Sequence, residues 1–386
     1  MKRTSADRLE DLSIMIAPRG LKSIPAFCKT VASFELYGRT IPLALVRTRR
    51  PHFDAGAPRH RDKALLRVHA FSCNFRDRAI ALDVADFAER NPDSGFVGIG
   101  SEFVARVEAV GARVQGLRIG DHVISDANYP DSGLAASEGG IPTNRASSRY
   151  LILSAKSLMR VPGTMDPAAA AAFTIGSQTS YSILRRLQLS KGMRVLVTSA
   201  SSNTSLFVLQ ALKRYKVSTF ASTSSKRHLA RINKLGVKHA FLVQRGSVSG
   251  SWSAIDDFCK QAEGFDAVID PFYDLNLRHA ARFIRPFGTY VTCGYQQQHG
   301  SANAEDRRFE TGPIDAVLPH IIGNNISIIG NCLGKTIDLK TALADYARRK
   351  LVPPIDSTFR PHQMAAFFRR SFTDGGRFGK VVMIYE

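Results

Sequence analysis

The strongest constraint on the fold is a regular alternation of short apolar segments and amphipathic segments between residues 194 and 331. In the amphipathic segments, apolar residues recur at three- and four-residue spacing, as at Leu206, Leu209 and Leu212, which is the period of a helix on a core. Buried strands that alternate with helices form a parallel, doubly wound sheet. We expect its strands at residues 194–199, 217–223, 239–243, 265–271, 288–294 and 325–331.

The first half of the chain has a different pattern, in which strand-like segments such as "ALLRVHAFSCNF" are punctuated by glycine. The chain ends with a helical segment, "PHQMAAFFRRSF", and a strand, "GKVVMIY", which the parallel sheet does not need. We expect both to return to the first domain. A chain of 386 residues is long enough for two domains. We assign residues 33–164 and 336–386 to a β-rich domain, 165–335 to the doubly wound domain and 1–32 to an N-terminal extension.

Several motifs occur in an order typical of one known family. "NFRD" at 74–77 is similar to the Asn-Phe-Arg-Asp of enoyl reductases. "GSEFVARVEAVGARVQGLRIGDHV" at 100–123 is similar to the signature G-x-E-x-x-G-x-V-x-x-V-G…G-D-x-V, with Ala105 where a glycine is usual. "KGMRVLVT", "FDAVIDP", "GTYVTCG" and "GRFGKVVMIY" match further blocks in register. From about residue 35 to 386 the chain therefore resembles the medium-chain dehydrogenase/reductases, in their zinc-free quinone-oxidoreductase and enoyl-reductase branch.

This resemblance implies an α/β fold of two domains, a GroES-like catalytic domain and a Rossmann domain that binds a nicotinamide cofactor. The active site is expected in the cleft between them. The resemblance also implies a homodimer, formed through the strand at 325–331.

The turn after the first parallel strand keeps the spacing of a dinucleotide-binding turn, but it contains serine instead of glycine. In the family this turn reads G/A-x-x-G-x-x-G, and the pyrophosphate rests on the helix N-terminus. Serine can donate to phosphate and cap a helix, although its side chain takes up room. A capped turn that binds nothing is therefore the alternative. We predict that the cofactor contacts Ser199, Ser202, Asn203, Thr204 and Ser205.

The residues that follow the second parallel strand discriminate between NAD and NADP. An acid at that place binds the ribose 2′-OH of NAD, whereas hydroxyls and bases suit the 2′-phosphate of NADP. The segment "FASTSSKRHLAR" (220–231) has no acid. An ordinary basic turn at the start of a surface helix is the alternative. We predict NADPH as the cofactor, with contacts to Ser222, Ser224, Ser225, Lys226 and Arg227.

No zinc site is expected. The resemblance places Asn74, Ser101 and approximately Ile175 where zinc-dependent relatives carry their ligands, and the five cysteines form no C-x-x-C pair. Without a Lewis acid, an activated C=C bond is easier to reduce than an isolated ketone, because hydrogen-bond donors can hold the enolate. The predicted activity is hydride transfer to an enone, quinone or dehydro-acyl substrate.

Three side chains are predicted to hold or protonate the enolate: Asn74, Arg76 and Tyr181. Each has a structural alternative, as a strand-end cap, as the partner of Asp77 and as a core residue, respectively. Enoyl reductases often carry a tyrosine shortly after "NFRD", and this chain has none there, so the proton donor stays open. Since ligands lie at the carboxyl ends of parallel strands, we also predict cofactor contacts from Cys293, Gly294 and Tyr295. "GNCLG" at 330–334 resembles the family's segment near the nicotinamide, which implies contacts from Asn331 and Cys332.

The formal net charge is +20, with 53 Lys and Arg against 33 Asp and Glu, which should attract anions. The densest basic segment, 47–63, is interrupted by acids, and no nucleic-acid-binding motif accompanies it. A generally basic surface is therefore favoured over a dedicated nucleic-acid site, and the basic charge leaves a nucleic-acid partner as the alternative. The alternative function is a non-catalytic binding or regulatory protein on the same scaffold, for example an RNA-binding one. The longest apolar stretches are too short for a membrane span, and unpaired cysteines fit a cytoplasmic protein.

Overall fold

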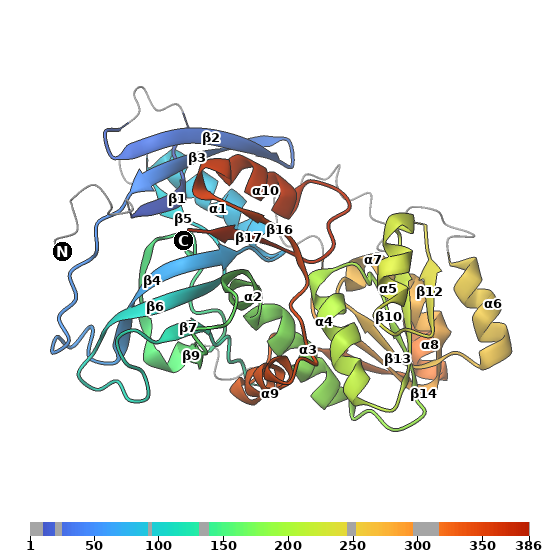
Figure 1. Cartoon of the computed structure of the whole chain (residues 1–386). Coiled ribbons are helices and arrows are strands. Elements are labelled where there is room, and N and C mark those ends of the chain that lie inside the picture. The colour runs from blue at the N-terminus through green and yellow to red at the C-terminus, as the bar shows by residue number, and fades with distance from the viewer. Residues whose placement is uncertain are drawn as a thin grey trace.

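The computed structural model describes residues 11–19, 25–91, 95–130, 139–244, 252–295 and 316–385. Figure 1 shows two domains side by side, with the blue and teal strands in one and the yellow and orange elements in the other. Residues 1–10 and 20–24, which belong to the predicted N-terminal extension, lie outside the described residues.

The second domain is built on a six-stranded parallel sheet in the order β12-β11-β10-β13-β14-β15. Its strands are β10 (Arg194–Val197), β11 (Ser218–Thr223), β12 (His239–Leu242), β13 (Phe265–Asp270), β14 (Ile284–Thr292) and β15 (Ser327–Gly330). The chain order reverses between β10 and β13, and in sheets of this kind ligands bind in the crevice outside the strand carboxyl ends at that point.

Helices bury both faces of this sheet, as a doubly wound fold requires. Val195 and Val197 face the core cluster of α3 and α4, whereas Leu196, between them, faces the opposite cluster. The helices are α3 (Thr174–Leu187), α4 (Asn203–Ala211), α5 (Leu229–Asn233), α6 (Ser253–Ala262), α7 (Tyr273–Ala280) and α8 (Leu318–Gly323). The predicted Rossmann-type arrangement is confirmed.

The first domain contains two sheets. A four-stranded sheet has the order β2-β3-β1-β5, from β1 (Leu12–Ile16), β2 (Cys28–Leu36), β3 (Arg39–Arg47) and β5 (Val97–Gly98). A seven-stranded sheet has the order β16-β17-β4-β6-β7-β9, with β8 paired to β4. Its strands are β4 (Lys63–Ser72), β6 (Glu102–Val110), β7 (His122–Ser125), β8 (Tyr150–Ser154), β9 (Leu158–Val161), β16 (Ile355–Phe359) and β17 (Lys380–Ile384).

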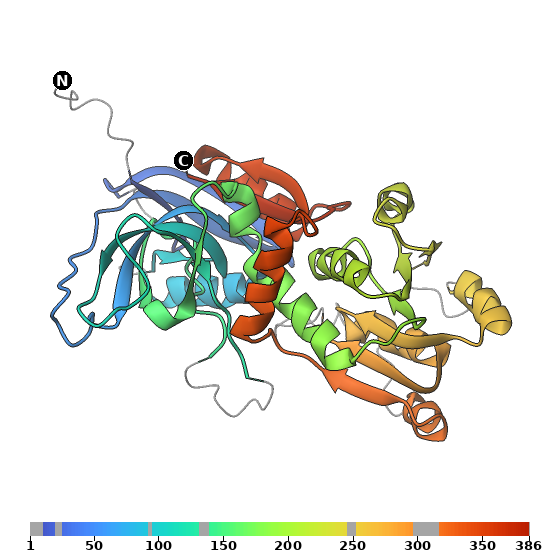
Figure 2. The ribbon, with the colours of Figure 1, turned by 60° about the horizontal axis from the view of Figure 1, so that its bottom comes forward.

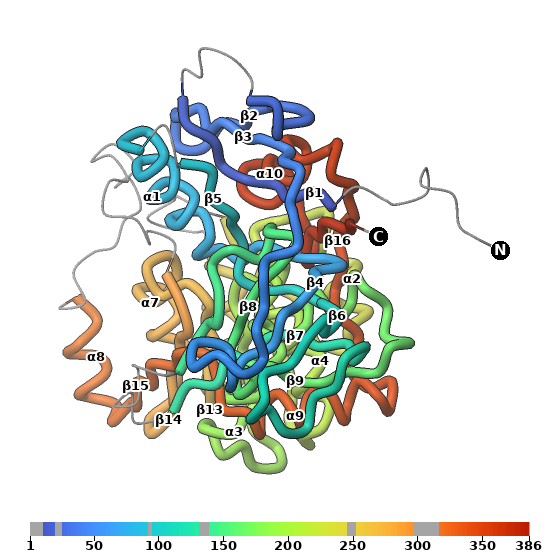
Figure 3. Tube along the Cα trace, turned by 90° about the vertical axis from the view of Figure 1, so that its left-hand side faces the viewer, coloured from blue at the N-terminus to red at the C-terminus, as the bar shows by residue number. Residues whose placement is uncertain are grey.

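Both ends of the described chain lie in this first domain. Strand β17 pairs antiparallel with β4, and α10 (Met364–Phe372) packs near β2 and β3, as Figure 3 shows. Strands β1 and the start of β2 fall within residues 1–32, where the sequence predicted only an extension. That assignment is wrong for the described part of the segment, because β1 pairs with β3 along its whole length.

Three helices connect the domains. The chain leaves the first domain through α2 (Pro167–Ala171) and α3, and it returns through α9 (Thr336–Ala347). Figure 2 shows α3 and α9 crossing between the two domains, and Arg185 of α3 forms an ion pair with Asp338 of α9 (Nε–Oδ1 2.9 Å). Helix α1 (Asp77–Arg90) follows β4 at the edge of the cleft. Among the described residues, no helix is both long and apolar enough to cross a bilayer.

Candidate functional site

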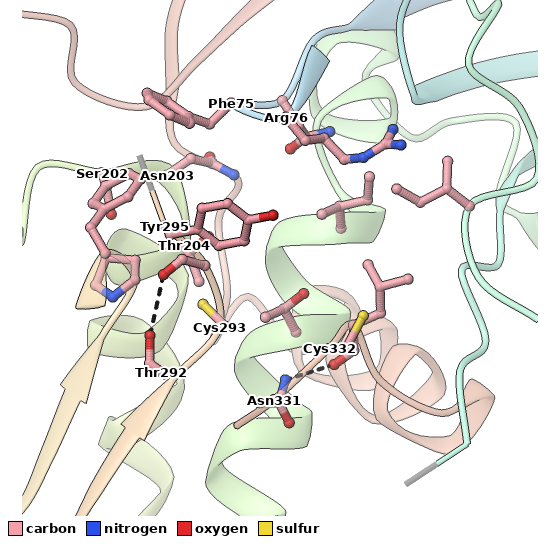
Figure 4. A pocket seen from close by; sticks show the side chains of 18 of the residues that line it. Phe75, Arg76, Ser202, Asn203, Thr204, Thr292, Cys293, Tyr295, Asn331 and Cys332 are labelled. Atoms are coloured by element: carbon pink, nitrogen blue, oxygen red, sulfur yellow. Dashed lines mark hydrogen bonds between the residues drawn. The ribbon is translucent and has the colours of Figure 1, made fainter. Parts of the chain in front are cut away.

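A cleft of about 820 Å³ lies between the two domains at the carboxyl ends of the parallel strands. One wall comes from the loop after β4, with Asn74, Phe75 and Arg76. The facing wall comes from the start of α4 and from the loops after β13, β14 and β15. Figure 4 shows Phe75, Arg76, Asn203, Tyr295 and Cys332 arranged around a common space. The crevice predicted from the strand order is therefore present.

The serine turn keeps the backbone of a dinucleotide-binding turn. Ser199 has a φ of 45°, in the left-handed region that favours glycine, and its Oγ accepts a hydrogen bond from Asn276 (3.2 Å). Ser202 caps α4 by accepting the backbone N–H of Ser205 (3.3 Å), and the Ser205 hydroxyl donates back to the carbonyl of Thr198 (2.9 Å). Each of the three serine hydroxyls thus forms a hydrogen bond within the protein, and of the three only Ser202 lines the cleft.

The start of α4 fits an anionic group. Asn203 and Thr204 line the cleft, and no acceptor within the described part of the chain takes the backbone N–H of either residue. Free N–H groups at a helix N-terminus attract phosphate. Arg377, across the cleft, has no carboxylate within 4 Å among the described residues, and burial lowers its pKa. A pyrophosphate is a group that would satisfy both features.

The residues predicted to contact the 2′-phosphate differ in how far they are exposed to solvent. Ser224, Lys226 and Arg227 are exposed at the carboxyl end of β11, and Arg227 lies against Gly376 of the first domain. Ser222 is fully buried in β11 with no partner for its hydroxyl among the described residues. Side chains alternate along a strand, and that of Ser222 faces the interior, so the structure does not bring it to the surface with Lys226 and Arg227. Ser225 is half-buried beside the exposed residues.

The residues predicted near the nicotinamide all line the cleft: Cys293, Gly294, Tyr295, Asn331 and Cys332. The Asn331 side chain is already engaged, since its Nδ2 donates to the carbonyl of Leu333 (2.9 Å) and its Oδ1 accepts from Ser182 (2.9 Å). Asn331 therefore shapes the loop. Burial raises the pKa of the Cys293 thiol to about 12, so that it is a neutral, apolar neighbour for a cofactor ring.

The polar centre of the cleft is Lys380, which the sequence did not indicate. Its side chain is 3% exposed, and its ammonium donates to Asn74 Oδ1 (2.7 Å), to the carbonyl of Cys73 (3.1 Å) and to Glu102. The strand register brings Lys380 and Glu102 together. Ser72 of β4 pairs with Glu102 of β6 on one side and with Val382 of β17, two residues after Lys380, on the other. Three segments far apart in the sequence thus place one buried ion pair on the cleft floor.

Asn74 is committed to this network. Its Nδ2 donates to Ser101 Oγ (3.0 Å) and to Glu102 Oε2 (3.0 Å), and its Oδ1 faces Lys380, which fixes the orientation of the amide. Because both N–H donors are used, the structure leaves Asn74 no N–H for an enolate in this arrangement, and its role as an enolate donor stays a prediction.

The former zinc-ligand positions do meet in space, but the donor set does not suit a metal. Asn74 contacts Ser101, and the backbone N–H of Ile175 donates to Glu102. Two carboxylates touch these positions. Glu102 is paired with the Lys380 ammonium, which repels a metal cation. Asp77 accepts hydrogen bonds from Ser101 Oγ (2.6 Å) and from the backbone N–H of Asn74 (2.7 Å). The described residues contain no cluster of three or more His, Cys, Asp or Glu that could hold a metal.

The other two predicted catalytic residues, Arg76 and Tyr181, lie in different parts of the structure. Arg76 lines the cleft, and its Nη1 donates to Asn144 (2.8 Å) and lies 3.3 Å from Asp77. Tyr181 points away from the cleft, into the core, where its hydroxyl donates to Asp345 (2.7 Å). Burial and the Asp345 carboxylate raise the pKa of Tyr181. The structure thus places Tyr181 in the core, which was the alternative for this residue, and its catalytic role stays a prediction.

Aromatic side chains from both domains also line the cleft, and the sequence did not reveal them. Phe75 meets Phe272 edge to face with ring centroids 5.1 Å apart, so one ring from each domain closes the cleft. Phe75 follows the carboxyl end of β4 and Phe272 follows that of β13, so an aromatic residue just after a strand was the sequence signal that could have identified them. Their contact depends on how the two domains sit, which local patterns do not encode.

Comparisons with known proteins agree with this architecture. The family described as "Alcohol dehydrogenase GroES-like domain" matches residues 60–163. The mouse "Synaptic vesicle membrane protein VAT-1 homolog-like" is 28% identical over 236 residues, which are 59% of this chain and 49% of that protein. A quinone oxidoreductase of Pseudomonas aeruginosa is 31% identical over 163 residues, 40% of this chain and 46% of that protein. The chain thus spans about half the length of the curated relatives it matches.

A solved NAD-dependent alcohol dehydrogenase superposes with a TM-score of 0.71 at 19% identity, covering 97% of this chain and 100% of that chain. This likeness shows the two-domain fold of a GroES-like and a Rossmann domain. The predicted resemblance to the medium-chain dehydrogenase/reductases is confirmed as a similarity, and the chain is also similar to a quinone oxidoreductase.

Proposed function

We propose that this protein is an NADPH-dependent, zinc-independent reductase of an activated C=C bond. The observation that carries this proposal is the buried Lys380 ammonium, which donates to Asn74, one of the positions that the resemblance aligns with the ligands of zinc-dependent relatives. A site that is already filled by a cation does not polarise a ketone as zinc does. An enone, quinone or dehydro-acyl substrate needs less electrostatic stabilisation, because the negative charge that develops on hydride transfer spreads over an enolate.

The chain's own residues can then be assigned roles. When bound, the reduced nicotinamide supplies a hydride to the β-carbon of the substrate. Cys293, Tyr295 and Cys332 form the pocket for that ring, and Phe75 and Phe272 exclude water from it. Arg76 is the donor available to the enolate oxygen, since its Nη2 and Nε have no partner among the described residues. The α-carbon then takes a proton from solvent.

The first test is a titration with NADPH and with NADH, followed by melting temperature. A cofactor at about 100 times its Kd stabilises the protein by roughly 2.7 kcal/mol. Stabilisation by NADPH at lower concentrations than NADH supports the proposal. Stabilisation by neither cofactor, with the fold intact, would favour a non-catalytic binding protein instead.

The choice of NADPH is tested by the variant K226A/R227A. Hydrogen bonds to charged groups contribute about 1.5 to 3 kcal/mol each, so we expect NADPH to bind at least about tenfold more weakly. NADH, which lacks the 2′-phosphate, should bind within about threefold of the wild type. K238A, which removes a lysine from the opposite end of the sheet, serves as the control. Equal losses for both cofactors would show that these residues do not select NADPH.

We further propose that the protein forms a homodimer through β15, the last strand of the sheet in the described chain. Ile328 on β15 and Ile322 on α8 are 42% and 73% exposed, and Phe287 beside them is 80% exposed. An exposed edge strand with apolar neighbours is suited to pairing with a second copy. We expect I328K to shift the sedimentation coefficient from that of a dimer to that of a monomer. A monomeric wild type would contradict this proposal.

A further inference from the structure

The charge of this protein is concentrated in a way that its cofactor does not explain. Residues 167–255 contain thirteen lysines and arginines and no aspartate or glutamate. Several of these bases have local roles: Arg185 and Arg214 pair with Asp338 and Asp345, and the Arg231 guanidinium stacks on Phe378. Of the ten other bases, five gather at one end of the parallel sheet.

Five lysines without a local role gather at the amino ends of β10, β11 and β12. All five are exposed, and none has a carboxylate within 4 Å among the described residues. We name this group the lysine face: Lys191, Lys213, Lys216, Lys234 and Lys238.

Backbone contacts hold the turns of the lysine face together. The Gly192 N–H donates to the carbonyl of Lys216 (2.8 Å), and the Lys238 N–H donates to the carbonyl of Thr219 (2.8 Å). The end of the Lys213 side chain lies over Gly236, 3.6 Å from where a Cβ would stand. Neighbouring strands are about 4.8 Å apart, so three adjacent strand ends form a compact patch.

Helix dipoles do not account for this charge. Helices α3, α4 and α5 all end near the lysine face, and a helix carboxyl end carries roughly half a negative charge. Three such ends offset about one and a half of five positive charges. An excess of roughly three charges is left facing solvent.

The lysine face is also separate from the cleft. The cleft lies at the carboxyl ends of the same strands, and strands of four to six residues span about 13 to 20 Å. An anion on the lysine face would therefore leave the cofactor site open.

We propose that the lysine face binds the phosphodiester backbone of a nucleic acid, without reading its sequence. The turns that carry it, 188–193, 212–217 and 233–238, have no exposed large apolar side chain. Protein interfaces rely on apolar and aromatic anchors, and stable membrane attachment needs a second signal besides a basic patch. Counterion release from a polyphosphate needs only the charges. Lysine, as a point charge, suits backbone contact and not base recognition.

The test measures binding of labelled single-stranded RNA and DNA of one sequence by fluorescence anisotropy at several salt concentrations. The variant K213Q/K216Q/K238Q removes three charges from the lysine face. The control K29Q/K156Q/K340Q removes three charges from exposed lysines elsewhere, on β2, after β8 and on α9. The melting temperature of each variant shows that the fold is intact.

We expect log Kd of the wild type to change with log salt with a slope of about 3 to 4, for five contacts to a single strand. The lysine-face variant should bind about tenfold or more weakly at low salt, with the slope lower by about 2, and the control should stay within about threefold. If RNA and DNA bind alike, the backbone is what is recognised. Equal weakening in both variants, no binding by the wild type, or tighter binding to phosphatidylserine vesicles would overturn the proposal.

Discussion

Replacing Lys380 by methionine is expected to lower the free energy of unfolding by about 3 to 5 kcal/mol. The substitution leaves Glu102 buried without its cation, with the carboxylate 1% exposed. Removing one partner of a buried ion pair costs more than the pair contributes, because an uncompensated charge stays in the interior. Urea unfolding of the apo protein, followed by circular dichroism, measures this loss. K340M, at an exposed lysine, should change stability by less than about 0.5 kcal/mol.

The double variant K380M/E102Q separates the ion pair from general packing. Glutamine removes the buried charge, and its single carbonyl oxygen can accept only one of the two N–H groups, of Asn74 and of Ile175, that donate to the two oxygens of Glu102. We expect it to be more stable than K380M by at least about 1 kcal/mol. If K380M unfolds like the wild type, the ammonium is solvated, and Lys380 is not the buried cation beside Asn74 on which the proposed function rests.

The sequence predicted the doubly wound sheet well because its signals are local. Apolar runs and three- to four-residue spacing within a segment determine which element forms, as at Val195–Val197 in β10 and Leu206–Leu209 in α4. Strand β1 escaped prediction because it is short and gains its place only by pairing with β3, some thirty residues later in the chain.

The site was predicted less well, because its chemistry depends on contacts between distant segments. Lys380 stands at the start of an apolar strand, and nothing near it in sequence reveals that it meets Asn74 and Glu102. Tyr181 lies on a helix that passes the cleft, but which side of the helix faces the cleft is decided by packing. Its partner, Asp345, lies 164 positions later in the chain. The loops after β14 and β15 do line the cleft. The first was predicted because ligands lie at strand carboxyl ends, and the second because its sequence resembles a family segment.

Replacing Asn203 by aspartate should change the apo protein and the complex in opposite directions. Asn203 is the first residue of α4, where a negative charge interacts favourably with the helix dipole. We expect the apo protein to gain about 0.3 to 1 kcal/mol of stability. The same charge would repel a pyrophosphate: at roughly 5 Å and an effective dielectric constant of about 20 the repulsion is about 3 kcal/mol. NADPH should therefore bind about 100-fold more weakly.

Two further variants make this result specific to the pyrophosphate. N203A removes the amide without adding charge, and it should weaken NADPH by no more than a few fold. N233D adds the same charge at the far end of the sheet, and it should leave NADPH affinity nearly unchanged. Because the melting temperature of apo N203D is expected to rise, weaker binding by this variant cannot come from unfolding. If N203D binds NADPH as tightly as the wild type, the cofactor does not rest on α4, and the serine turn is only a helix cap.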